Sequence, residues 1–214
     1  MNTVQFGLER EKCITAVFSL TPFLSTSLVK LEFGGVSDRM VQRVLKRMVE
    51  RQMLSRFRYG QEYIYHVIPK NQKWRHHLEV ARFHYAFIGS LANWQEILEY
   101  EFEKVVGSAV ADIYYKMIYK PDDIREFYVE VDMGSHRINF DKYPKHYTVI
   151  LVTPQKVKPP ANWIQTTTEK VKKSGIRLGS ENRKVNDKWF QGIPEKAEEK
   201  NSKSTFFQQG KPIR

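Results

Sequence analysis

The spacing of apolar residues predicts three helices near the start of the chain. Apolar side chains recur at helical spacing over residues 9–21, and Pro22 limits that segment. Residues 25–27 offer an N-cap to a second, short helix. A third helix begins at Ser37 or Asp38 and continues to about residue 52, with an apolar stripe at i, i+3, i+4, i+7 and i+8.

A β-hairpin is expected directly after these helices. Residues 53–59 have strand character, Gly60 and Gln61 form a turn, and residues 62–67 return as a second strand. Three helices followed by a hairpin predict a winged helix-turn-helix over residues 1–72. In such a module the third helix enters the major groove of DNA, and the hairpin lies along the backbone.

The third predicted helix has a polar, basic face opposite its apolar stripe. Arginine can bridge two acceptors of guanine, and glutamine can pair with adenine, so the first part of this face suits base readout. Basic residues farther along the helix and on the hairpin suit phosphate contacts. We expect base contacts from Ser37, Arg39, Gln42 and Arg43, and phosphate contacts from Lys46, Arg47, Arg56 and Arg58.

A second module with a different pattern follows over residues 73–154. It begins with a helical stretch and ends with a nearly continuous apolar run that suits a strand buried on both faces. The expected order is αβββαβ, which predicts an α/β sandwich and an α+β fold for the whole chain. The elements are a helix at 74–90, strands at 94–106, 111–117 and 126–133, a short helix at 138–143 and a strand at 147–152.

The remaining residues, 155–214, show no sustained period of 2 or 3.6. They are rich in lysine and polar residues, so we expect a largely flexible basic tail with at most a short helix near residues 162–173. Such a tail is either a solvated segment or a non-specific contact with phosphates. A salt-dependent loss of affinity on its removal separates the two.

Composition supports a folded protein with a polyanionic partner. Of the 214 residues, 41% are hydrophobic, which is enough for a substantial core. The formal net charge is +11, distributed as +5 over residues 1–70, −2 over residues 71–154 and +8 over residues 155–214. Basic ends around a near-neutral middle favour modules with different tasks and DNA as the partner.

Several classes of site are excluded by the sequence. The single cysteine, Cys13, cannot build a disulfide framework or a cysteine-based zinc site within one chain. The histidines lack zinc-ligand spacing, and no glycine-rich loop carries the Gly-Lys-Ser/Thr of a nucleotide-binding motif. The start of the chain lacks the pattern of a secretory signal, and no apolar run spans a bilayer. We therefore expect a cytoplasmic protein without a membrane partner.

The order of several weak motifs resembles the replication-relaxation family. After the helix–hairpin module come the sequences RHHLEVA at residues 75–81, AD at 111–112, VEVD at 129–132 and VILVTP at 149–154. The resemblance covers roughly residues 8–154. It implies a protein of a plasmid, phage or integrative element that acts in DNA replication, relaxation or conjugative mobilisation.

The second module also resembles the PD-(D/E)XK nucleases, which are restriction-endonuclease-like. Asp112 matches the first acid, although Ala111 replaces the proline of the motif, and Glu130 matches the second acid. Asp132 stands where the motif has lysine. Because residues two apart share a strand face, the three carboxylates of Asp112, Glu130 and Asp132 are candidate catalytic residues and Mg²⁺ ligands. Glu79 is a further candidate, and Lys142 is a candidate replacement for the missing lysine.

Three functions remain open from the sequence. The leading one is a sequence-specific double-stranded DNA-binding protein, not an enzyme, that needs no cofactor to bind. The second is a Mg²⁺-dependent nuclease or nicking accessory, and the third is a plain transcriptional regulator. Other replication or relaxosome proteins are further expected partners, and two half-sites on DNA would require a homodimer.

Overall fold

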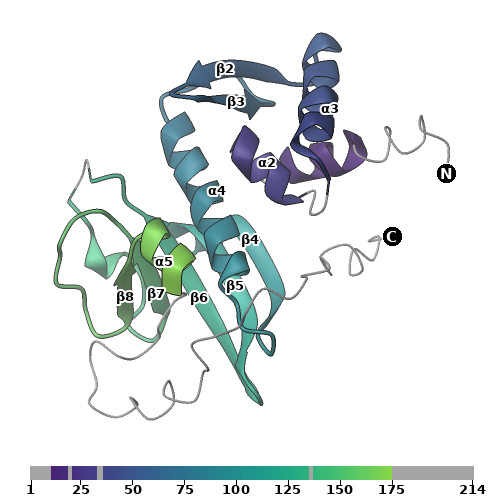
Figure 1. Ribbon diagram of the computed structural model, residues 1–214. Coiled ribbons are helices and arrows are strands. Elements are labelled where there is room, and N and C mark those ends of the chain that lie inside the picture. The colour runs from purple at the N-terminus through teal and green to yellow at the C-terminus, as the bar shows by residue number, and fades with distance from the viewer. Residues whose placement is uncertain (1–10, 19–20, 33–35, 135–136, 175–214) are drawn as a thin grey trace.

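Two β-sheets joined by one long helix organise the protein (Figure 1). The computed structural model describes residues 11–18, 21–32, 36–134 and 137–174. A three-stranded sheet belongs to the N-terminal module, and a mixed five-stranded sheet belongs to the second module. The fold is therefore α+β, as the sequence predicts. Among the described residues, every helix is too short or too polar to traverse a bilayer.

The N-terminal module combines three helical segments with an antiparallel sheet of order β1-β3-β2. The sequence does not predict β1, which pairs through Phe23 with His66 and through Ser25 with Ile64. Tertiary pairing creates this strand, because three residues are too few to show an alternating pattern. The elements are a helix at residues 11–18, β1 (Phe23–Ser25), α2 (Thr26–Glu32), α3 (Asp38–Glu50), β2 (Ser55–Tyr59) and β3 (Glu62–His66).

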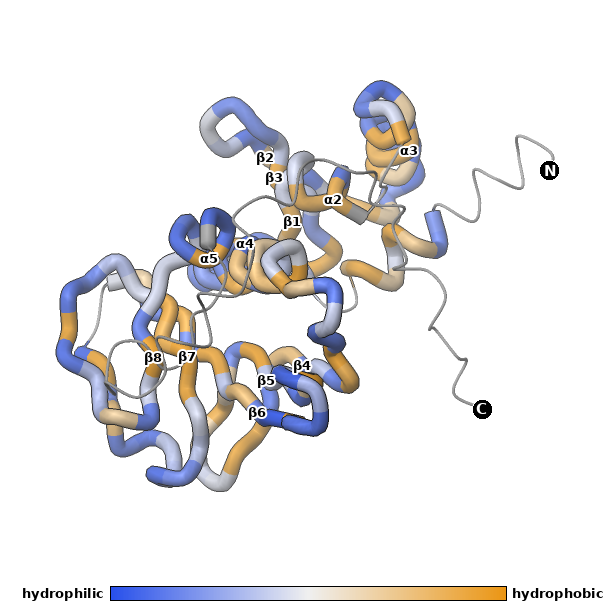
Figure 2. The backbone as a smooth tube through the Cα atoms, turned by 60° about the horizontal axis from the view of Figure 1, so that its bottom comes forward, coloured by the Kyte–Doolittle hydropathy of each residue, from blue (hydrophilic) through white to orange (hydrophobic). Residues whose placement is uncertain are grey.

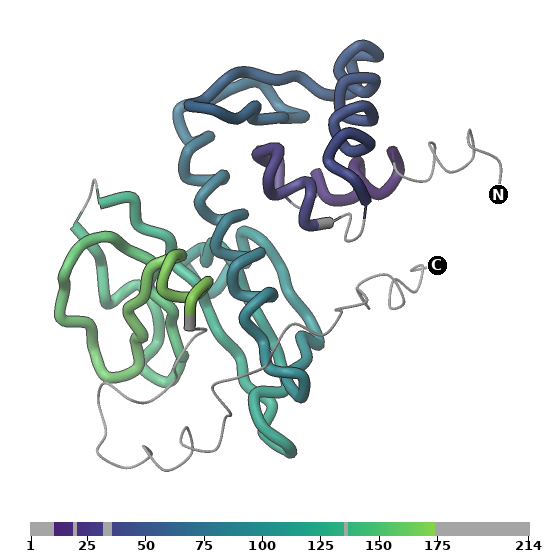
Figure 3. The backbone as a smooth tube through the Cα atoms, in the orientation of Figure 1, coloured from purple at the N-terminus to yellow at the C-terminus, as the bar shows by residue number. Residues whose placement is uncertain are grey.

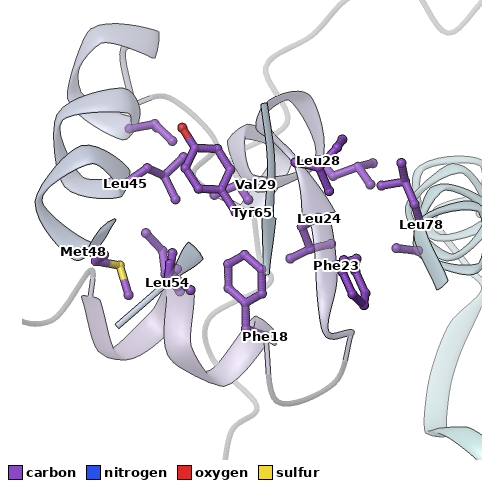
Figure 4. Close-up of a cluster of buried hydrophobic side chains, with 14 of the residues drawn as sticks. Phe18, Phe23, Leu24, Leu28, Val29, Leu45, Met48, Leu54, Tyr65 and Leu78 are labelled. Carbon is purple, nitrogen blue, oxygen red and sulfur yellow. The ribbon is translucent and has the colours of Figure 1, made fainter. Parts of the chain in front are cut away.

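The predicted apolar stripe of α3 forms one side of the N-terminal core. Leu45 and Met48 are fully buried there, next to Phe18 of the first helix and Tyr65 of β3 (Figure 4). Leu54, which follows α3, completes this part of the core. Burying one stripe of α3 leaves its opposite face for solvent or a partner.

The helix α4 (Trp74–Gly89) belongs to both cores of the protein (Figure 3). Its first half packs Leu78 and Ala81 into the N-terminal core. Its second half packs Phe83 and Phe87 against the five-stranded sheet. The two modules are therefore connected by a rigid element with a hydrophobic contact on each side, and not by a bare linker.

The five-stranded sheet has the order β4-β5-β6-β7-β8. Strands β4, β5 and β6 pair antiparallel, whereas β6, β7 and β8 pair parallel. In Figure 2 strand β7 is largely hydrophobic, whereas α5 (Thr168–Ser174), which lies beside α4, is largely hydrophilic. The elements are β4 (Glu96–Val106), β5 (Ala109–Lys120), β6 (Asp123–Val131), the 3-10 helix η1 (Phe140–Lys142), β7 (Thr148–Val152), β8 (Trp163–Thr166) and α5 (Thr168–Ser174).

The structure differs from the prediction in two parts of the second module. The expected helix at 138–143 is only the three-residue η1. The expected flexible tail begins too early, because β8 extends the sheet beside β7 and α5 buries Val171 completely. The short helix expected near residues 162–173 corresponds to α5, whereas β8 was not predicted, because a strand of four residues is too short to leave a visible period. The rest of the predicted tail, residues 175–214, lies outside the described residues.

Candidate functional site

The outer face of α3 carries Arg39, Gln42 and Arg43, and the fourth predicted base-contact residue, Ser37, precedes the helix. Ser37 is the N-cap residue of α3, in extended conformation, and the described structure gives its side chain no capping hydrogen bond. Ser37, Arg39, Gln42 and Arg43 are all exposed, and so is Lys46 one turn later. We call these five residues the α3 surface. It displays three cations and two neutral hydrogen-bonding side chains.

A salt bridge fixes the beginning of α3 against α2. The Nζ atom of Lys30 lies 2.5 Å from Oδ2 of Asp38, the first residue of α3. The carboxylate also stabilises the amino end of the helix dipole. Lys30 offsets the charge of Asp38, so the acidic residue next to the α3 surface is paired.

Arg47, one of the predicted phosphate contacts, forms an ion pair within the N-terminal module. Its Nε atom lies 2.5 Å from Oε1 of Glu11, and Nη1 of Arg51 lies 3.1 Å from Oε2 of the same carboxylate. The side chain of Glu11 is only 6% exposed, so this ion pair tethers the first helix to α3. Arg47 thus contributes to the packing of the module, and its contact with phosphates stays a prediction. The sequence did not indicate the ion pair, because the two residues are far apart in the chain.

The predicted phosphate-contact residues of the hairpin are exposed on β2. Arg56 stacks over the ring of Tyr63, with 4.4 Å between Cζ and the ring centroid. Nε of Arg58 donates to the carbonyl of Gly60 at 3.3 Å. Gly60 has a φ of +60°, a conformation that glycine adopts without strain, and so it forms the hairpin turn. Both arginines share one face of β2 because they are two residues apart.

In the second module, Asp112 of β5 joins α4 to the end of β6. Its Oδ1 lies 2.8 Å from Nε2 of His76, which is near the start of α4. Its Oδ2 accepts the backbone N–H of Val131 at 2.7 Å, beyond the last regular pair between the two strands. The hydrogen bond to Asp112 raises the pKa of His76, so this pair favours a protonated imidazole.

Glu130 lies beside this pair and has two partners of its own. Its Oε1 accepts from Nζ of Lys142 at 2.6 Å and from the hydroxyl of Tyr143. Burial raises the pKa of Glu130, the two hydrogen bonds oppose that shift, and the charge of Asp112 adds to it. His76, Asp112, Glu130, Lys142 and Tyr143 are therefore electrostatically coupled, and we call them the acidic cluster.

Asp132 does not join the acidic cluster. Asp132 directly follows the last residue of β6, Val131. Oδ2 of Asp132 instead accepts from Oγ1 of Thr153 at 2.7 Å and from the N–H of Gly134 at 3.1 Å. The three predicted carboxylates are thus not gathered at one point. Within the described ranges, no group of three or more His, Cys, Asp or Glu residues is arranged to hold a metal ion.

The other two candidates for the acidic site, Glu79 and Lys142, lie in different surroundings. Oε1 of Glu79 accepts from Oγ1 of Thr168 at 2.7 Å and so joins α4 to α5. Lys142 does reach Glu130, and its Nζ also donates to the carbonyl of Val110 at 2.8 Å. The prediction that Lys142 stands in for the missing lysine therefore has a geometric basis, although that role stays a prediction.

Sequence reasoning missed two members of the acidic cluster, His76 and Tyr143. No local signal marks His76, because its partner Asp112 is 36 positions away. Tyr143 directly follows Lys142, but only the fold of the segment after β6 brings both side chains to Glu130. No protein-family model, curated protein or solved structure matches this chain.

Proposed function

We propose that the N-terminal module is a winged helix-turn-helix that binds double-stranded DNA, with the α3 surface in the major groove. The single observation that carries this proposal is the division of α3 into two faces. Leu45 and Met48 are fully buried, whereas Arg39, Gln42 and Arg43 are exposed together. A helix with this division can insert its polar face without disturbing the core.

The order of the elements supports this proposal. A helix, a short strand, two further helices and a hairpin occur in sequence, and the three strands form one antiparallel sheet. The hairpin leads away from α3 toward the start of α4, and its exposed Arg56 and Arg58 would provide charges for the DNA backbone. Base readout and phosphate contact are thereby divided between helix and hairpin.

We further propose a role at an origin, a transfer origin or an operator of a mobile genetic element. The resemblance to the replication-relaxation family supports this role. The second module would then organise partner proteins or a second copy of the chain. Regulation of transcription by the same DNA contact is the alternative role.

Binding to a selected site compared with random DNA tests the proposal. A site is first enriched from a random duplex library with the wild-type protein, and affinity is then measured by gel shift with competitor DNA. Arg39→Ala combined with Arg43→Ala should weaken specific binding by about 1–3 kcal/mol for each lost bidentate contact and should relax sequence preference. The matched control replaces two exposed arginines of the second module, Arg125 and Arg137, by alanine. Equal affinity and selectivity in both double variants would refute the assignment of α3.

Hydrolysis of DNA at the acidic cluster is the second candidate function. One observation favours it: Nζ of Lys142 lies 2.6 Å from Oε1 of Glu130, and the charge of Asp112 acts on the same carboxylate. A site of three carboxylates for Mg²⁺ does not fit, because Asp132 is bonded elsewhere. The chain's own residues hold two paired charges there, His76 with Asp112 and Lys142 with Glu130.

Nicking of supercoiled DNA in the presence and absence of Mg²⁺ tests this second candidate. Asp112→Asn should abolish Mg²⁺-dependent nicks while leaving duplex affinity unchanged, if the cluster is catalytic. Asp132→Asn is the matched control, since it removes the same charge from outside the cluster. Intact DNA with the wild-type protein at all Mg²⁺ concentrations would leave DNA binding as the function of the chain.

A further inference from the structure

A second basic surface lies at the junction of the hairpin and α4. Between Glu62 and Glu79 the sequence contains no acidic residue, and it contains three lysine and arginine residues. These are Lys70, Lys73 and Arg75, and all three are exposed. Within the described residues, none of them is in a salt bridge with a carboxylate. We call these three residues the α4 surface.

Aromatic side chains hold the α4 surface in place. Nζ of Lys70 lies 4.4 Å from the ring centroid of Phe57, and Cζ of Arg75 lies 5.6 Å from that of Tyr59. Trp74 contacts both rings edge-on, with centroids 4.9 Å apart in each case. The charged ends of Lys70 and Arg75 are therefore positioned by packing of their stems and by cation–π contact, without neutralisation by an acid.

The α4 surface and the arginines of β2 lie on opposite faces of the hairpin. Phe57 and Tyr59 alternate along β2 with Arg56 and Arg58, and alternate residues of a strand point to opposite faces. Lys70 and Arg75 lie over the aromatic face. Cations thus flank the hairpin on both faces. A hairpin that contacts the DNA backbone with one face needs cations on that face alone.

We propose that the α4 surface binds a second set of phosphates of double-stranded DNA, in addition to those contacted by the α3 surface and the hairpin arginines. This inference rests on the proposed DNA-binding function. Continuity with the hairpin and the lack of acidic residues favour the sugar–phosphate backbone over an acidic protein, which would need no neighbouring DNA contact. Each phosphate bound by a cation releases a counterion, so the surface adds affinity for every sequence alike.

The salt dependence of binding to a short random-sequence duplex tests the proposal. Affinity is measured by fluorescence anisotropy between about 50 and 200 mM KCl for the wild-type protein and for the variant K70Q/K73Q/R75Q. Glutamine retains much of each side-chain stem over the aromatic rings. Each lost phosphate contact lowers the slope of log Kobs against log salt by about 0.9, so the variant should lose about 2–3 units of slope. Its preference for a selected site over random DNA should be unchanged.

Two controls separate the possible results. The variant R125Q/R137Q/K145Q removes the same charge from exposed positions of the second module and should keep the wild-type slope. The variant K70R/R75K keeps every charge and should keep the slope as well. A wild-type slope in K70Q/K73Q/R75Q would overturn the proposal, even where R39A/R43A still weakens binding. Absence of duplex binding by the wild-type protein at low salt would instead overturn the proposed function itself.

Discussion

The ion pair between Glu11 and Arg47 gives a prediction that separates stability from DNA contact. Arg47→Ala removes a guanidinium that lies 2.5 Å from a carboxylate whose side chain is only 6% exposed. Arg51 remains 3.1 Å from the other oxygen of that carboxylate. The substitution therefore leaves Glu11 partly paired and still buried.

The expected loss of stability follows from this geometry. Removing one partner of a fully buried ion pair costs about 3–5 kcal/mol. Here Arg47 is itself 38% exposed, and Arg51 still compensates the charge, so we expect about 1–2 kcal/mol. Replacing both residues, as Glu11→Gln with Arg47→Ala, should cost less than the sum of the two single changes, because no buried charge is left behind.

Urea unfolding followed by circular dichroism measures these free energies. Lys46→Ala is the matched control on the same helix, since the ion pair of Lys46 with Glu50, at 3.7 Å, is exposed. Its unfolding free energy should lie within about 0.5 kcal/mol of the wild-type value. An Arg47→Ala protein of wild-type stability that binds DNA as poorly as Arg43→Ala would refute the reasoning. Arg47 would then be a phosphate contact, as the sequence predicts.

Three substitutions test buried parts of the second module. Burial lowers the pKa of His84 to about 3, so the unfolded chain takes up a proton below about pH 6.5 while the folded chain stays neutral. As the pH falls from about 6.5 to about 3, the free energy of unfolding should therefore decrease by up to about 1.4 kcal/mol per pH unit. His84→Phe should lack this part of the pH dependence when the free energy is measured by urea unfolding at several pH values. An equal pH dependence in both proteins would contradict this. Lys142→Met should lower the melting temperature by leaving Glu130 without its cation, and adding Glu130→Gln should restore it, whereas no rescue would show that the pair is not the cause. Phe83→Ala should lower the free energy of unfolding by about 3–5 kcal/mol, and the exposed control Val105→Ala should lower it by less than about 0.5 kcal/mol. The unfolding transitions followed by fluorescence and by circular dichroism should still coincide. Separate transitions would show that α4 does not couple the modules.

The periodicity of apolar residues was sufficient to predict a helix or strand wherever that element is long and has one buried face. The apolar stripe of α3 alone predicts its bounds to within two residues and its exposed basic face. The hairpin, α4 and the strands up to β7 are likewise visible as local patterns. Short elements such as β1 and β8 are not, because their stability comes from pairing with distant strands and not from their own residues.

The candidate sites also differ in how far the sequence alone predicts them. The α3 surface could be derived from the sequence, since side chains three and four apart on a helix share a face whatever the helix packs against. Only the tertiary structure brought Lys142 and His76 to the carboxylates and left Asp132 outside, because these contacts join separate elements. The tertiary structure also pairs Arg47 with Glu11 and places Lys70 and Arg75 over the rings of β2. Local spacing determined which residues share an element's face, and packing between elements decided which charges are paired and which remain exposed.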